Sequence, residues 1–110
     1  MAATSFPKSE IKILLLENVH PVAAEAFRAD GFHVETVTSA MPEAELAARV
    51  RDVHVLGIRS KTRVTDEVLA GAESLLAVGC FCIGVNQVEL PAANRRGVPV
   101  FNAPEPLPPE

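Results

Sequence analysis

The sequence predicts an α/β fold, a doubly wound parallel sheet of five strands. Five aliphatic or β-branched runs recur along the 110 residues, and the centres of successive runs lie 21 or 22 residues apart. That period is the length of one strand, one short helix and two tight loops. Alternation of strands and helices favours a parallel sheet with right-handed crossovers, and the length fits a single domain.

The five runs differ in how completely they are apolar. Leu14–Leu16 and Leu75–Ile83 are almost uninterrupted, which is typical of strands covered on both faces, whereas Val34–Thr38 alternates with polar residues as an edge strand does. The predicted strands are Ile11–Leu16, His33–Thr38, Val53–Ile58, Leu75–Ile83 and Val98–Phe101. The rhythm does not order these strands, so flavodoxin-like and Rossmann-like arrangements both fit.

Four amphipathic segments between the runs are predicted to be helices. Gly31 and Gly97 follow the first and the last of them as stop signals, and Thr65 can cap the third. The predicted helices are Pro21–Ala29, Pro42–Val50, Asp66–Ala72 and Pro91–Arg96. None is predicted after the fifth strand, so we expect the sheet to lack its last covering helix.

Composition argues against several classes of partner. The net charge is −4, and Trp and Tyr are absent, which disfavours nucleic-acid binding. The longest uncharged apolar run, Leu75–Val85, is shorter than the roughly 20 residues that span a bilayer. Cys80 and Cys82 share one face of a strand and are expected to be buried thiols. We therefore expect a cytoplasmic protein without membrane or nucleic-acid partners.

The chain divides into three parts by composition. Residues 1–10 form a polar leader without the apolar core of a secretion signal. Residues 11–104 carry the strand–helix rhythm and form the predicted domain. Residues 105–110 form a Pro-rich tail, which favours extended polyproline II structure and cannot continue the rhythm.

The sharpest candidate site follows the third predicted strand. Ligands of open α/β sheets bind beyond the carboxyl ends of the strands, and Arg59, Ser60, Lys61 and Thr62 stand at such an end. This turn offers a guanidinium, an ammonium, two hydroxyls and backbone N–H groups, which together suit a carboxylate or phosphate. The alternative is a solvated basic turn with no specific ligand.

Other nucleotide and metal sites are disfavoured by the residues present. Val85 and Asn86 stand where a phosphate loop ending at Gly84 needs Lys and Ser or Thr. Glu17–His20 replaces the Ser/Thr-rich loop of a flavodoxin. The three histidines are separated by one strand–helix unit each, and none has a charged neighbour that the sequence identifies, so we expect no metal site and no histidine catalyst.

Three motifs resemble the D-isomer-specific 2-hydroxyacid dehydrogenases, an oxidoreductase family. They are Gly57–Thr62, Gly79–Val88 and Arg96–Pro104, and the similarity extends from about Ile11 to Pro104. The match is to the branch of this family that oxidises 3-phosphoglycerate with NAD at the start of serine biosynthesis. The resemblance implies the family's N-terminal substrate-binding domain, with a flavodoxin-like fold.

The same resemblance implies roles for individual residues. The turn Arg59–Lys61 would bind the substrate and help to hold its phosphate. Gly84, Val85 and Asn86 would lie against the substrate carboxylate. Asn102 would face the interdomain cleft near the nicotinamide and so contribute to the cofactor site.

Residues 105–110 depart from the family pattern. In the family this segment leads into the dinucleotide-binding domain, which carries the glycine-rich loop and the catalytic Arg, Glu and His. The sequence therefore predicts a substrate-domain fragment that is inactive alone, binds no NAD, binds 3-phosphoglycerate or a similar phosphorylated acid weakly, and self-associates through its uncovered face. The alternative is a stand-alone, non-enzymatic module that binds small anions or a protein partner.

Overall fold

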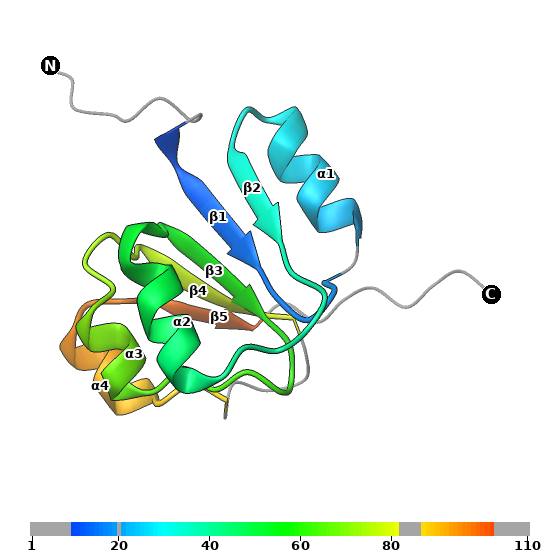
Figure 1. Cartoon of the computed structure of the whole chain (residues 1–110). Coiled ribbons are helices and arrows are strands. Elements are labelled where there is room, and N and C mark those ends of the chain that lie inside the picture. Colours follow the sequence, from blue (N-terminus) through cyan, green and yellow to red (C-terminus); the bar gives the residue numbers. More distant parts are fainter. Residues whose placement is uncertain (1–9, 20, 82–86, 103–110) are drawn as a thin grey trace, which may run out of the picture.

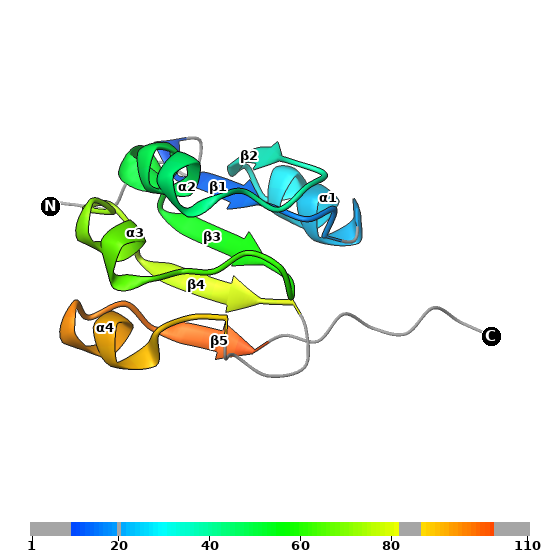
Figure 2. The same ribbon diagram turned by 60° about the horizontal axis from the view of Figure 1, so that its bottom comes forward.

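The computed structural model describes residues 10–19, 21–81 and 87–102, which form one five-stranded parallel sheet with helices on both faces (Figures 1 and 2). The strands lie in the order β2-β1-β3-β4-β5. This is the flavodoxin-like order, so the fold class is confirmed and the open choice between two arrangements is decided. The strands are β1 (Lys12–Leu15), β2 (His33–Thr36), β3 (Val55–Ile58), β4 (Ala77–Cys80) and β5 (Val100–Asn102).

The helices occupy the predicted segments: the first has the predicted bounds, and the ends of the others differ by at most two residues. Gly31 and Gly97 both have positive φ, 100° and 71°, as stop residues of this kind require. Thr65 caps the third helix, since its hydroxyl oxygen accepts the Val68 N–H at 3.4 Å. The helices are α1 (Pro21–Ala29), α2 (Glu43–Arg49), α3 (Asp66–Ala70) and α4 (Leu90–Arg95), and the short 3₁₀ helix η2 (Val50–Asp52) follows α2.

Alternate residues of β1 enter two separate cores, one on each face of the sheet. Leu14 lies in the larger core, which the sheet forms with α2, α3 and α4. Ile13 and Leu15 lie in a smaller core against α1, which also contains Phe27 and Phe32. Because successive residues of a strand point to opposite faces, the uninterrupted run in β1 does indicate cover on both sides, and the doubly wound prediction is confirmed.

The apolar run around β4 is only partly covered on its second face, so the prediction for this strand holds on one side of the sheet alone: on the other side Phe81 packs against the smaller core, but Ala77 and Gly79 are not fully buried. Val78 and Cys80 are fully buried on the side of the larger core, whereas Ala77 and Gly79 are only half-buried. Phe101 of β5 pairs with Gly79 and has 59% of its surface exposed. Within the described part of the chain, α1 is the only helix on this face, and it contributes to a core with β1 rather than with β5.

Two further predictions concern the cysteines and the membrane. Cys80 has no exposed surface and lies in the larger core, so its assignment as a buried thiol is confirmed, while Cys82 lies outside the described residues. Across residues 10–19, 21–81 and 87–102, no helix is long and apolar enough to span a bilayer.

Candidate functional site

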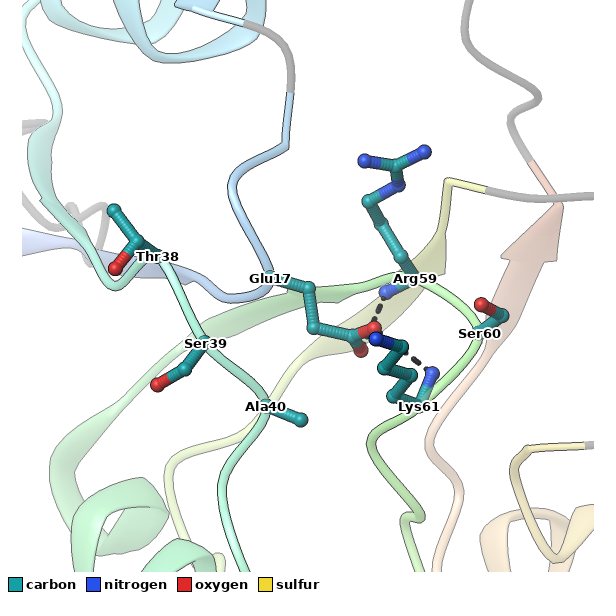
Figure 3. A pocket seen from close by; sticks show the side chains of 7 residues that line it. All are labelled: Glu17, Thr38, Ser39, Ala40, Arg59, Ser60 and Lys61. Carbon is teal, nitrogen blue, oxygen red and sulfur yellow. Dashed lines mark hydrogen bonds between the residues drawn. The ribbon is translucent and has the colours of Figure 1, made fainter.

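The loops at the carboxyl ends of β1, β2 and β3 enclose a pocket of about 490 Å³ (Figure 3). The turn after β3 supplies Arg59, Ser60 and Lys61, so the structure brings these three predicted residues together at the expected edge of the sheet. The residues that line the pocket are Glu17, Thr38, Ser39, Ala40, Arg59, Ser60 and Lys61.

The turn after β3 is anchored at both ends by buried residues. Ile58 before it and Thr62 after it have no exposed surface, whereas Arg59, Ser60 and Lys61 between them are exposed. The apolar strand and the buried threonine therefore fix where the turn leaves and re-enters the protein. Three polar side chains are presented to solvent from one short segment.

Glu17, which the sequence analysis left without a role, organises this turn. One carboxylate oxygen accepts the N–H groups of Arg59 and Thr62, each at 2.9 Å, and the other accepts the Lys61 N–H at 2.8 Å. These N–H groups were expected to be donors for a ligand, and that expectation is wrong because Glu17 occupies them. Three of the four N–H groups of residues 59 to 62 therefore already have Glu17 as their acceptor, which leaves the side chains of the turn as the main groups for a ligand.

The backbone at Glu17 turns sharply as it leaves β1. Glu17 and the next residue, Asn18, have left-handed φ values of 62° and 56°, which are uncommon for residues other than glycine. Their N–H groups donate to the carbonyl oxygens of Ser39 at 3.2 Å and Val37 at 3.1 Å. These bonds offset the backbone strain, and the turn directs the Glu17 side chain toward the loop after β3.

A signal for Glu17 was present in the sequence. Glu17 comes directly after the buried run Leu14–Leu16, and only 8% of its surface is exposed. A carboxylate in that position must find hydrogen-bond donors, because leaving a charge buried and unpaired is costly. The donors come from residues 42 to 45 positions away, so the sequence could indicate the need but not the partner.

The environment of Glu17 favours its ionised form. Burial, the largest influence, raises the pKa of Glu17, but contact with the Thr62 side chain and the bonds from three N–H groups outweigh it and lower the pKa below its ordinary value. At neutral pH the pocket therefore carries one carboxylate with the two basic side chains Arg59 and Lys61. The formal charge of these three side chains is therefore +1, which favours an anionic ligand.

Acid is expected to destabilise the protein, partly through Glu17. A carboxyl group whose pKa is lower folded than unfolded binds fewer protons in the folded state, so its contribution is complete above the unfolded pKa, about 4.3 for Glu, and is lost as the pH falls through the folded pKa. The pKa of Glu17 is lowered. Urea unfolding measured between about pH 7 and pH 3 should show the corresponding decrease in the free energy of unfolding. In Glu17→Gln the decline below about pH 4.3 should be shallower, and an unchanged pH profile would contradict this assignment.

Other predicted site residues lie elsewhere. Asn102 stands at the carboxyl end of β5, two strands from β3, and does not line the pocket. Its amide nitrogen donates to the Cys80 carbonyl oxygen at 3.5 Å. Gly84, Val85 and Asn86 lie outside the described residues.

The two described histidines have local contacts away from the pocket. His54 Nδ1 accepts the Lys12 N–H at 3.0 Å. His33 Nε2 lies 3.4 Å from a Glu35 carboxylate oxygen, a charged neighbour that the sequence alone does not identify. The third, His20, lies outside the described residues. Among the residues described, no cluster of three or more His, Cys, Asp or Glu side chains is arranged to bind a metal.

Comparisons with known proteins give a consistent family. The family model for the D-isomer specific 2-hydroxyacid dehydrogenase catalytic domain matches residues 13–109. D-3-phosphoglycerate dehydrogenase of Dictyostelium discoideum is 57% identical over 101 residues, which are 92% of this chain and 25% of that protein. The Escherichia coli D-3-phosphoglycerate dehydrogenase is 50% identical over 105 residues, 94% of this chain and 26% of that protein. This chain therefore spans about a quarter of the length of these relatives.

Solved structures share the fold. The TT0316 protein of Thermus thermophilus superposes with a TM-score of 0.75 at 31% identity, over 82% of this chain and 29% of that one. The NAD⁺-bound 3-phosphoglycerate dehydrogenase of Entamoeba histolytica superposes with a TM-score of 0.73, over 84% of this chain and 32% of that one. Its identity is 16%, so that likeness concerns the fold alone.

Proposed function

Because this chain belongs to the D-isomer specific 2-hydroxyacid dehydrogenase family, we propose that it is the substrate-binding part of an NAD-dependent D-3-phosphoglycerate dehydrogenase, an enzyme of serine biosynthesis acting in the cytoplasm. The proposal assigns substrate binding to Arg59, Ser60 and Lys61. In the complete enzyme, Gly84, Val85 and Asn86 would lie against the substrate carboxylate, and Asn102 would face the interdomain cleft near the nicotinamide.

One observation supports this proposal above the others, namely the pocket that displays Arg59, Ser60 and Lys61 from a single turn. 3-Phosphoglycerate carries a carboxylate, a hydroxyl and a phosphate. A guanidinium can bind a carboxylate or phosphate through two parallel hydrogen bonds, while an ammonium attracts the same groups as a point charge. The Ser60 hydroxyl can donate to either anion. About 490 Å³ is within the usual range for small-molecule pockets.

The redox chemistry requires parts that these residues do not supply. Hydride transfer needs the nicotinamide close to the substrate carbon and a positioned acid–base group. The 110 residues contain no Gly-x-Gly-x-x-Gly sequence, the signature of a loop that holds a dinucleotide pyrophosphate. By themselves, the 110 residues are therefore expected neither to bind NAD nor to oxidise 3-phosphoglycerate.

Ligand titration of the purified chain, followed by NMR, tests the proposal. 3-Phosphoglycerate should bind with a dissociation constant near 1 mM at best, about 4 kcal/mol, because these 110 residues alone supply only one side of the cleft proposed for the complete enzyme. Glycerate and inorganic phosphate should bind more weakly than the molecule that combines their groups, and NAD should perturb no resonance. Absence of 3-phosphoglycerate binding would overturn the proposal. NAD reduction by this chain alone would contradict the inference that hydride transfer requires parts of the enzyme other than these 110 residues.

We also propose self-association through the side of β4 and β5 that no helix of the described residues covers. Phe101 is 59% exposed there, and exposed apolar surface of this kind often mediates contacts between proteins. Sedimentation velocity should show concentration-dependent association that Phe101→Ser reduces. Val22→Ser removes a valine that is 57% exposed on α1 and should leave association unchanged. A wild-type chain that stays monomeric at high concentration would rule the proposal out.

A further inference from the structure

We propose that Glu17 is a positioning residue, whose carboxylate holds the turn after β3 in the conformation that presents Arg59 and Ser60 to the anionic substrate. This inference rests on the proposed function, because it concerns the same pocket. It adds a residue from a different strand end, one that the family motifs quoted for this chain do not include.

The contacts of the carboxylate support this role directly. Its two oxygens accept three N–H groups from the four residues 59 to 62, at distances between 2.8 and 2.9 Å. Hydrogen bonds to an ionised acceptor are roughly twice as strong as neutral ones. One side chain of the β1 loop therefore fixes most of the backbone of the substrate turn, on which the side chains of Arg59, Ser60 and Lys61 are exposed.

The arrangement separates the charge of Glu17 from that of Arg59. The carboxylate points at the backbone of the turn, and Figure 3 shows the Arg59 guanidinium directed away from it. The negative charge is compensated mainly by backbone N–H groups.

Glu17 also connects two walls of the pocket. Its own N–H donates to the Ser39 carbonyl oxygen at 3.2 Å, in the segment Thr38–Ala40 that forms the wall after β2. Its carboxylate binds the turn after β3, which forms the opposite wall. Only 8% of the residue is exposed, so the connection is shielded from solvent. Glu17 thus links the two walls of the pocket through its backbone and its side chain.

Glu17→Gln tests the inference because it keeps the size of the side chain but removes the charge and one acceptor oxygen. Amide hydrogen exchange at Arg59, Lys61 and Thr62 should accelerate about tenfold or more, since at least one N–H then faces an amide NH₂. Exchange at the Val78 N–H, which donates to the Pro99 carbonyl oxygen outside the turn, serves as the internal reference. The affinity for 3-phosphoglycerate should fall about fivefold to tenfold.

The matched control is Glu35→Gln. Glu35 is a partly buried carboxylate of β2, paired with Arg49 at 2.9 Å, and it does not line the pocket. Its replacement should alter neither exchange in the turn nor ligand affinity. Glu17→Asp retains the charge on a shorter side chain and should restore part of the protection. It replaces Glu17→Gln in the comparison if that variant does not fold.

The outcomes separate this inference from the proposed function. If the wild-type chain binds 3-phosphoglycerate but Glu17→Gln binds it equally well, or exchange in the turn relative to Val78 is unchanged, the positioning role is overturned. If the wild-type chain does not bind 3-phosphoglycerate, the proposed function fails. In that case the exchange comparison alone decides whether Glu17 holds the turn.

Discussion

Replacement of Arg59 by alanine should weaken 3-phosphoglycerate binding about tenfold to a hundredfold, because a charge-assisted hydrogen bond contributes roughly 1.5–3 kcal/mol. Arg59 stands in the pocket on a turn whose backbone is already fixed by Glu17, so the variant removes a side chain without releasing the loop. The loss should appear in an NMR titration as failure to saturate at ligand concentrations that saturate the wild-type chain.

Two variants give this experiment its controls. Arg63→Ala removes the same side chain four residues further along, where the arginine is exposed and outside the pocket. It should leave binding almost unchanged. Arg59→Lys keeps the charge but loses the planar fork, so intermediate affinity is expected. Equal affinity in wild type and Arg59→Ala would leave the segment Arg59–Thr62 as an ordinary solvated turn.

Leu56→Ala should destabilise the fold by about 2–5 kcal/mol, the usual cost of a leucine-sized cavity in a packed core. Leu56 has no exposed surface, lies in the middle of β3 and belongs to the larger core. Since β3 pairs with both β1 and β4, the cavity cannot close without moving the centre of the sheet. Urea unfolding should show a lower midpoint with a similar slope.

Leu76→Ala is the matched control, with the same change of side chain. Leu76 lies just before β4 and 56% of its surface is exposed, so its replacement should change the unfolding free energy by less than about 0.5–1 kcal/mol. Similar losses in the two variants would mean that the larger core has been assigned incorrectly. A loss confined to Leu56→Ala supports the packing described above.

The local features of this fold could be predicted from the sequence because their causes are local. Gly31 ends α1 since a residue with φ of 100° must tolerate the left-handed region. Thr65 caps α3 through a hydroxyl three residues from its partner. The alternation of Val34–Thr38 indicated the edge position that β2 occupies. The even spacing of apolar runs indicated strand–helix units, because each unit is a continuous stretch of the sequence.

Part of the candidate site could also be predicted from the sequence. Arg59, Ser60 and Lys61 follow a buried strand, and parallel strands bring their carboxyl ends to one edge of the sheet, where the structure has the pocket. The order of the strands in the sheet decides which other loops line the pocket together with that turn. Because β1 lies between β2 and β3, Glu17 and Ser39 reach the same pocket, and the rhythm of the sequence carries no information about that order.

Tertiary structure alone decided the partners of Glu17 and the cover of β4. The Glu17 carboxylate meets N–H groups 42 to 45 residues away, a juxtaposition created by the pairing of β1 with β3. The apolar run in β1 is buried on both faces, whereas the similar run around β4 leaves Gly79 half-buried and, beside it, Phe101 exposed. Apolar composition is a property of each residue, but burial depends on which helix the crossovers place over each strand.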